Sequence, residues 1–418
     1  MQICIFEDKN YINLEPLIYS RPVYQLVCGI TTLKEKILQS FPGRKYSLHC
    51  RAYLRDVLQQ EFPKTPINKI TDDECLFING RILSDINLSK LLTSKEDKLF
   101  LSGNVVVAAR LSGERLSFFK DKMPEVFGAE NFFGLPTQQL KIKFVDYIWD
   151  LINNNGKEIK KDYIYLTGKG RAVKKGLRRK IHTGVHFVNK KHVFIGDGVE
   201  IKPGCVIDAS EGPVYIDNDA FLYPNVVITG PVYIGQGTRI KSGATIYENV
   251  SIGKICKVGG EVEDMIMMPY SNKQHSGFIG HAYIGSWVNL GADTNNSDLK
   301  NNYSTIKVAI NGKEINSGIQ FLGLIMGDHS KSAINTMFNT GTVVGFSSNV
   351  FGTGFPSKEI PSFSWGGSEG MIKYKVEKSI ETAKNVLERR NIKMSDPDKK
   401  LFMDIYEMTR DARMRKGY

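Results

Sequence analysis

Isoleucine, leucine and valine recur at every sixth position through the middle of the chain. Counting in steps of six gives an unbroken aliphatic series: Ile216, Leu222, Ile228, Ile234, Ile240, Ile246, Ile252 and Val258. If about a quarter of all positions carried one of these three residues, eight in succession would arise by chance roughly once in 10⁴ to 10⁵. The rhythm also covers flanking series, the last of them interrupted by Ser332: Ile195, Ile201, Ile207; Phe278, Ile284, Leu290; Met326, Phe338, Val344, Val350.

A six-residue period matches neither the 3.6-residue turn of an α-helix nor the simple alternation of a flat sheet. It matches a coil of three short strands in which one aliphatic side chain per strand points to the axis. The sequence therefore predicts a left-handed parallel β-helix, and a sandwich of short strands is the alternative. Glycine often follows the aliphatic residue, which we interpret as a corner needing unusual φ: Ile195-Gly196, Ile234-Gly235, Ile252-Gly253, Ile284-Gly285.

The rhythm is interrupted four times, near residues 208–213, 259–277, 295–318 and 352–370. A solenoid can eject loops without disturbing its stacked core, and such loops often build the functional face. The second interruption contains His275 and the third contains Asn302 and Tyr303. We predict four ejected loops, two of which carry candidate chemistry.

The chain before about residue 180 has a different pattern. Short apolar segments at 4–6, 76–78 and 105–107 alternate with helix-like stretches such as Thr32 to Ser40, which predicts an α/β domain. The division expected is an α/β domain over residues 1–180, a β-helix over 181–370 and a helical extension over 371–418.

The extension has helical spacing in two places. Val376, Ile380, Ala383 and Leu387 would share one helix face, and Leu401, Ile405 and Met408 would share another. Ser395-Asp396-Pro397 is a helix-start signal for the second. We predict that both helices pack against the solenoid or a neighbouring subunit, and that the basic end at 410–418 is solvated.

Composition narrows the class of protein. With 41% hydrophobic and 24% charged residues and no apolar run long enough to span a membrane, the chain is expected to be globular, without membrane insertion. Six dispersed cysteines match neither a zinc site nor a disulfide framework and favour the cytoplasm. The net charge of +12 is dispersed, so we expect anionic small-molecule substrates in preference to nucleic acid.

The region from about 185 to 355 resembles the acetyltransferase half of the bifunctional GlmU family, which acetylates glucosamine-1-phosphate and then uridylylates the product. The family's pattern of glutamate, histidine fourteen residues later and then aliphatic-Gly is met by Glu261, His275 and Ile279-Gly280. The following A-x-I-G, V-N-[IL]-G-A and N-Y are met by Ala282–Gly285, Val288–Ala292 and Asn302-Tyr303. The resemblance implies a homotrimer that holds acetyl-CoA, its co-substrate, between neighbouring subunits.

His275 is the candidate general base. An ammonium must lose a proton before its nitrogen attacks a thioester, and imidazole titrates in the range where it can accept one. Glu261 would orient the imidazole, as a carboxylate does in a catalytic triad. The alternative for His275 is a solvated loop histidine, and the alternative for Glu261 is a surface carboxylate.

The resemblance also assigns roles to other residues. The Ala292 backbone and the Asn302 side chain would donate to the oxyanion of the tetrahedral intermediate. The resemblance also implies residues that line the sugar pocket, Phe278, Asn289 and Tyr303. It further implies residues that bind the sugar phosphate, Lys241 and Lys307, and residues that contact acetyl-CoA, Ala292 and Ile334. Lys241 stands where the family has an arginine, and Glu263 stands where it has a lysine, so the amino sugar itself is not determined. Asn295, Asn296 and Asn301 are interpreted as structural.

Two further hypotheses compete with acyl transfer. His275, His281 and His329 could in principle bind zinc, as in trimeric β-helices that are carbonic anhydrases, but a gap of six places the first two on adjacent prism faces, and no metal site is predicted. The other alternative is a non-catalytic scaffold that binds nucleotide sugars, or a nucleotidyltransferase whose acyltransferase domain is inactive.

The first domain resembles the sugar nucleotidyltransferases that carry a C-terminal β-helix, through 20–23, 29–36 and 79–83. The resemblance implies nucleotide binding by Arg21, Asn79 and Arg81 and a requirement for Mg²⁺. Two features depart from the pattern: no G-x-G-T-R phosphate loop follows the first strand, and the metal-holding Gly-Asp reads Gly80-Arg81. Because phosphoryl transfer relies on metal and backbone donors, this domain is expected either to form or only to bind the nucleotide-linked sugar.

Overall fold

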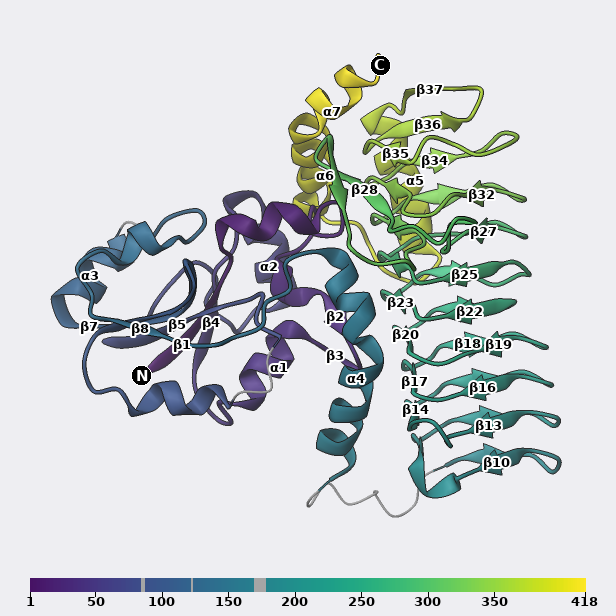
Figure 1. Cartoon of the computed structure of the whole chain (residues 1–418), viewed down its shortest axis with the longest axis horizontal. Coiled ribbons are helices and arrows are strands. Elements are labelled where there is room, and N and C mark those ends of the chain that lie inside the picture. The colour runs from purple at the N-terminus through teal and green to yellow at the C-terminus, as the bar shows by residue number, and fades with distance from the viewer. Residues whose placement is uncertain (84–86, 122, 169–177) are drawn as a thin grey trace.

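The computed structural model describes residues 1–83, 87–121, 123–168 and 178–418. Figure 1 shows an α/β domain lying beside a stack of short strands, with the C-terminal helices packed near the last coils. Both parts agree with the predicted fold classes. Among the described residues, no helix is both long and apolar enough to cross a bilayer.

The first domain is built on one mixed sheet with strand order β4-β1-β5-β7-β6-β8. Its central strands β1 and β5 are almost fully buried and pair in parallel, which explains their continuous apolar sequences. Strand β4 pairs in parallel with the other side of β1, so β4 and β5 lie on opposite sides of β1 in the sheet. The strands are β1 (Gln2–Phe6), β4 (Tyr46–Leu48), β5 (Glu74–Asn79), β6 (Lys98–Ser102), β7 (Val105–Ser112) and β8 (Thr137–Gln139).

The helix predicted at 32–40 is α1 (Leu33–Gln39). It begins with a capping box between Thr32 and Glu35, which satisfies backbone N–H groups of the first turn. The domain's other helices are α2 (Arg55–Glu61), α3 (Gly113–Asp121) and α4 (Ile148–Thr167). A short hairpin of β2 (Val27–Cys28) and β3 (Thr31–Thr32) precedes α1.

The solenoid has three faces of stacked parallel strands. The basic face begins with β9 (Lys180–Ile181), β12 (Glu200–Ile201), β15 (Phe221–Leu222), β18 (Arg239–Ile240), β21 (Lys257–Val258) and β24 (Asn272–Lys273). The apolar face begins with β10 (His186–Val188), β13 (Val206–Asp208), β16 (Val227–Thr229), β19 (Thr245–Ile246), β22 (Glu261–Glu263) and β25 (Phe278–Gly280).

The third face, here called the domain face, is turned toward α4 (Figure 1). Its strands are β11 (Val193–Ile195), β14 (Val214–Ile216), β17 (Val232–Ile234), β20 (Val250–Ile252), β23 (Ile266–Met267), β26 (Tyr283–Ile284), β30 (Ile325–Met326), β33 (Val343–Val344) and β35 (Glu359–Ile360). The upper coils add β27 (Asn295–Asn296) and β32 (Met337–Phe338) beyond the apolar face, and β31 (Lys331–Ser332) and β34 (Asn349–Val350) beyond the basic face.

The predicted aliphatic columns fill the solenoid axis: every member of the series from Ile216 to Val258 has no exposed surface. The predicted loop at 259–277 is wrong. The coil continues there through Val258, Val262, Met267, Lys273, Ile279, Ile284 and Leu290, in steps of four, five, six, six, five and six residues. The shortened corners shift the phase, so Ile279 is the inward residue and Phe278 is not.

The glycines after the aliphatic residues do not have the unusual φ that we predicted, so that interpretation is wrong. Gly235 and Gly253 do not have positive φ, and the left-handed conformation falls two residues later, at Gly237 and Ile255. A Cβ on Gly235 would lie 2.5 Å from the carbonyl carbon of Gly253 in the next coil. Close stacking of coils, rather than backbone conformation, therefore requires glycine at these positions.

The other interruptions correspond to excursions from the coil. Residues between β13 and β14 pass over α4, and residues after Ser297 leave the solenoid to form the hairpin of β28 (Lys307–Ile310) and β29 (Lys313–Asn316). The chain rejoins the coil at β35 within the fourth interruption. It then forms the hairpin of β36 (Ser364–Gly367) and β37 (Gly370–Lys373).

Polar contacts join the first domain to the domain face. The Asn155 amide of α4 donates to the Asn249 carbonyl at 2.7 Å, and Ser251 Oγ donates to the Gly29 carbonyl at 2.7 Å. The Tyr283 hydroxyl donates to the Val27 carbonyl at 3.0 Å. All three solenoid residues lie on or next to strands facing the domain, so the two parts form one packed unit.

The C-terminal helices are α5 (Val376–Glu388), α6 (Asp396–Met408) and α7 (Arg410–Arg415), and α6 has the predicted start at Ser395. The prediction of a solvated end holds for residues 410–411 and 414–417, which are exposed, and is wrong for Arg413 and Tyr418. Arg413 is 1% exposed and donates to the Tyr406 carbonyl at 2.6 Å, and the Tyr418 hydroxyl lies 2.7 Å from Ser364 Oγ. The end of the chain covers the last coils of the solenoid.

Candidate functional site

Several predicted site residues lie along one edge of the prism. This edge, here called the histidine edge, leads from the basic face to the apolar face through residues 241–244, 259–260, 274–277, 291–294 and 333–336. It carries Lys241, His275, Ala292 and Ile334, which lie in four of these five corners. His275 and Ile334 are exposed, whereas Lys241 and Ala292 are half-buried.

Backbone contacts fix the order of the corners along this edge. A Cβ on Gly259 would lie 2.8 Å from the Gln274 carbonyl and 3.2 Å from Lys241 Cβ, so the lysine is two coils from the histidine turn. On the far side, Asp293 N donates to the Ser276 carbonyl at 3.1 Å, and Asn335 N donates to the Ala292 carbonyl at 2.8 Å.

Glu261 and Phe278 flank the turn of His275 on the apolar face. They are partners in the parallel register of β22 and β25, so they occupy adjacent rungs. Glu261 is exposed and Phe278 half-buried. Asn295 in the next rung accepts a hydrogen bond from Phe278 N at 2.7 Å, and Asn296 bonds both backbone groups of Gly280, which is the structural role expected of these asparagines.

An internal lysine supports the turn of His275. Lys273 occupies an inward position beside Val258 and is 1% exposed. Its Nζ donates to the carbonyl of Gly259 at 2.8 Å and to the carbonyl of His275 at 3.0 Å. Burial lowers the pKa of Lys273 to about 8, although Asp293 and Glu261 oppose the shift.

Asn289 and a group of cations lie on the basic face next to this edge. Asn289 forms β-bridges with Asn272 in the coil before it and Lys331 in the coil after it. Arg239 and Lys257 pair with each other in the parallel register of the two coils that precede Asn272. Burial, followed by Arg390 and Arg239, lowers the pKa of Lys257. The face beside His275 therefore has a positive potential suited to an anionic ligand.

Asn302, Tyr303 and Lys307 lie elsewhere. They belong to the excursion that leaves the solenoid at the opposite edge of the apolar face, where Leu322 N returns to bond the Asp298 carbonyl at 2.8 Å. Lys307 pairs with Glu314 across the β28–β29 hairpin at 2.6 Å, and Asn311 in the same hairpin bonds the Ile12 carbonyl of the first domain. Among the described residues, no hydrogen bond joins these three side chains to His275, so their roles stay predictions.

That opposite edge carries a second histidine. His281 Nδ1 lies 2.8 Å from Asp298 Oδ2, and its Nε2 lies 3.7 Å from Asp264 Oδ2. Burial alone would lower the pKa of His281, but Asp298 and Asp264 outweigh it and the pKa is raised. His329 lies at the third edge, where burial holds its pKa well below the usual range. The three histidines thus occupy three different edges and cannot share one metal ion within a chain.

In the first domain, the carboxyl ends of β1 and β5 are the usual place for a nucleotide in such sheets. Arg81 follows β5 and has no exposed surface; its Nη2 lies 2.6 Å from Asp8 and its Nη1 lies 2.8 Å from Asp146. Asn79 donates to Asp8 at 2.9 Å and to the Val106 carbonyl. Their polar groups bind other parts of the domain, and the predicted nucleotide role stays a prediction.

A second ion pair fills the same end of the sheet. Glu7, directly after β1, is fully buried, lies 3.1 Å from Arg51 Nε and accepts from Val23 N at 2.9 Å. Because Glu7 and Asp8 are both neutralised by arginine, they do not fit a Mg²⁺ site, which needs carboxylate oxygens open to metal and phosphate.

Arg21 lies at the junction of the domains. Its guanidinium and the Ser20 hydroxyl both bind the Asp328 carboxylate of the solenoid, and these side chains border a cavity of about 620 Å³ between the first domain, the domain face and α6. Arg21 therefore contributes to the contact between domains, and nucleotide binding by this residue stays a prediction.

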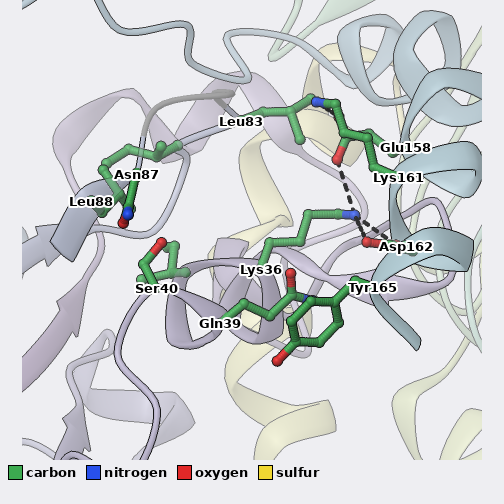
Figure 2. Close-up of a pocket in the computed structure, with 12 residues that line it drawn as sticks. Lys36, Gln39, Ser40, Leu83, Asn87, Leu88, Glu158, Lys161, Asp162 and Tyr165 are labelled. Carbon is green, nitrogen blue, oxygen red and sulfur yellow. Dashed lines mark hydrogen bonds and ion pairs between the residues drawn. The ribbon is translucent and has the colours of Figure 1, made fainter. Parts of the chain in front are cut away.

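A cavity of about 500 Å³ lies entirely within the first domain, between α1, the segment after β5 and α4. Figure 2 shows Lys36 reaching between two carboxylates of α4, Glu158 at 3.0 Å and Asp162 at 2.7 Å. Gln39, Ser40 and Asn87 also border the cavity. Its size suits a small ligand.

Comparison with known proteins agrees with both halves of this description. A family model described as sugar nucleotidyl transferase matches residues 3–171, and one described as bacterial transferase hexapeptide matches residues 213–248. The chain thus combines a first domain that matches sugar nucleotidyl transferases with a solenoid that matches bacterial transferase hexapeptide repeats.

Three curated relatives specify the family. The bifunctional protein GlmU of Methanocaldococcus jannaschii is 31% identical over 315 residues, which cover 66% of this chain and 70% of the relative. GlmU of Wigglesworthia glossinidia brevipalpis is 28% identical, covering 63% and 53%. The bifunctional sugar-1-phosphate nucleotidylyltransferase/acetyltransferase of Sulfurisphaera tokodaii is 29% identical, covering 36% and 43%. The chain belongs to the family of the bifunctional protein GlmU, and it spans about half the length of the latter two relatives.

Proposed function

We propose that the solenoid transfers an acetyl group from acetyl-CoA to the amine of an amino-sugar-1-phosphate. The observation that carries this proposal is the alignment of Lys241, His275, Ala292 and Ile334 along one edge, with Glu261 beside it. His275 is exposed there, so its imidazole is accessible to a ligand.

The chemistry follows from the positions of these groups. His275 removes a proton from the substrate ammonium, the nitrogen attacks the thioester carbonyl, and collapse of the tetrahedral intermediate breaks the carbon–sulfur bond. The imidazole then gives this proton to the departing thiolate, and the second proton lost by the attacking nitrogen passes to solvent. Lys241 and the cations of the basic face attract the sugar phosphate as point charges.

The active assembly in this proposal is a homotrimer. The apolar face presents exposed aliphatic side chains at Val188, Val227 and Met337, which favour contact with another subunit. A neighbouring subunit packed there would bring residues of its own excursion toward His275. In such a trimer, Asn302 of one subunit and His275 of its neighbour would share one site, although the two residues lie at different edges of a single chain.

For the first domain, we propose binding of the nucleotide-linked sugar in the cavity beside Lys36. The match to sugar nucleotidyl transferases supports the ligand class. The internal pairing of Glu7 and Asp8 with arginines favours binding over turnover, because it leaves these carboxylates without a role in holding metal and triphosphate. All six cysteines are free and buried, which supports a reducing compartment such as the cytoplasm.

Two assays test the proposal. The first follows thiol release from acetyl-CoA with glucosamine-1-phosphate as acceptor, in wild type and His275→Ala. Equal inertness of both proteins, with UDP-sugars still bound, would establish the scaffold alternative. The second follows pyrophosphate during incubation with UTP, Mg²⁺ and N-acetylglucosamine-1-phosphate, and turnover would show that the first domain is a catalyst and not only a binding module.

A further inference from the structure

Lys273 occupies a position where the fold calls for an aliphatic side chain. It stands in the inward column between Val258 and Leu290, both of which are buried and apolar. Burying an amine costs free energy unless its N–H groups find acceptors. The acceptors here are two backbone carbonyls, those of Gly259 and His275, so the lysine joins two successive corners of the histidine edge from inside.

The local backbone leaves room for this ammonium. Gly260 has φ +71°, and a Cβ there would lie 2.7 Å from Lys273 Nζ and 2.9 Å from the His275 carbonyl. The same Cβ would lie 2.8 Å from the Gly277 carbonyl, on the other side of the histidine. The Lys273 ammonium and the turn of His275 therefore both pack closely against Gly260, where a larger residue would not fit.

We propose that Lys273 is a positioning residue, which fixes the turn of His275 from within the solenoid and so determines where the imidazole meets the substrate. This inference rests on the proposed acyl transfer at the histidine edge. Lys273 touches neither substrate nor reacting atoms; it acts through the carbonyl of His275. A misplacement of about 1 Å can lower a rate by about 100-fold, so a small movement of this turn has a measurable effect.

The decisive variant is Lys273→Met, which keeps the length of the side chain and removes both hydrogen bonds. The expected result is a fall in kcat of about tenfold or more with KM changed by less than about twofold, because the turn moves while the binding groups stay. Lys34→Met is the matched control: Lys34 is also buried, with its ammonium over the Phe62 ring, but belongs to the first domain. It should leave both constants unchanged.

A second readout does not depend on activity. In protein labelled with ¹³C-histidine, the His275 ring resonance should shift in Lys273→Met and stay in place in Lys34→Met. In wild type it should also follow the ionisation of Lys273, whose charged neighbours are Glu261 and Asp293.

These readouts separate two failures. Absence of acetyl transfer in wild type would refute the proposed function. The shift of the His275 ring resonance in Lys273→Met would still test the positioning role, because it does not depend on activity. Wild-type kcat and an unmoved resonance in Lys273→Met would overturn the inference. If that variant does not fold, the absence of a transition near pH 8 in the His275 resonance of wild type would overturn it instead.

Discussion

The Nη2 atom of Arg81 lies 2.6 Å from Oδ2 of Asp8, where neither side chain has more than marginal exposure. The pair occupies the end of the sheet at which related folds hold a nucleotide. In this chain it acts as an internal support of the first domain.

Asp8→Asn should therefore destabilise the first domain by about 3–5 kcal/mol, because it leaves a buried guanidinium partly uncompensated. Urea unfolding followed by circular dichroism measures the loss. Glu407→Gln is the control, since Glu407 forms an exposed pair with Arg410 and its loss should cost less than about 1 kcal/mol. Equal effects of the two substitutions would show that the Arg81 pair is not a structural support.

Gly235→Ala tests the stacking of the coils. The added Cβ would meet the backbone of Gly253 at 2.5 Å, so the two coils must separate, and we expect a loss of several kcal/mol, on the order of the largest single-residue effects. Gly243→Ala is the comparison: φ there is +69° with open space around the Cβ, so only backbone strain of about 1–2 kcal/mol applies. A smaller loss at Gly235 than at Gly243 in thermal unfolding would contradict the stacking argument.

His281 should make stability depend on pH. Its pKa is raised in the folded protein, so its interaction with Asp298 and Asp264 stabilises fully below the unfolded pKa of about 6.5 and is lost as pH rises through the folded value. His281→Gln should thus be more destabilising at pH 5.5 than at pH 9. Urea midpoints at both pH values measure the difference, and a pH-independent effect would show that the carboxylates do not stabilise the imidazolium.

Lys273 should have the opposite dependence. Its folded pKa of about 8 lies below the ordinary 10.5, so between these values the unfolded chain binds more protons and the free energy of unfolding rises with pH. The shift corresponds to about 3 kcal/mol at 1.36 kcal/mol per unit. Wild type should gain this amount relative to Lys273→Met between pH 7.5 and pH 10.5. A constant difference between the two proteins would show that the amine ionises normally.

The solenoid was predictable because its aliphatic period is local and regular, and each coil repeats the same packing. The aliphatic pattern is lost where a polar side chain enters the axis: Lys273 interrupts the pattern, and the short corners around Val262 and Met267 shift its phase. Those corners made 259–277 resemble a loop. Only the register of β22 with β25 identifies Ile279 as the inward residue.

The candidate site was predictable in part. The family resemblance groups Lys241, Glu261 and His275 in one site. The structure places Lys241 and His275 on one edge, two coils apart, with Glu261 beside that edge on β22. The positions of Asn302 and Lys307 depend on where the excursion after Ser297 leaves and rejoins the solenoid, which no local pattern encodes. The same holds for Arg81, whose burial depends on contacts with Asp8 and Asp146 that are distant in sequence. The contacts of Tyr418 with Ser364 are equally non-local.

The most direct test of the central claim compares two histidines at the two edges of the apolar face. Thiol release from acetyl-CoA with glucosamine-1-phosphate is measured for wild type, His275→Asn and His281→Asn. Loss of the general base should lower kcat by about 10²–10⁴-fold in His275→Asn, while His281→Asn retains wild-type turnover at pH 8. Full activity in His275→Asn would contradict the assignment of acyl transfer to the histidine edge.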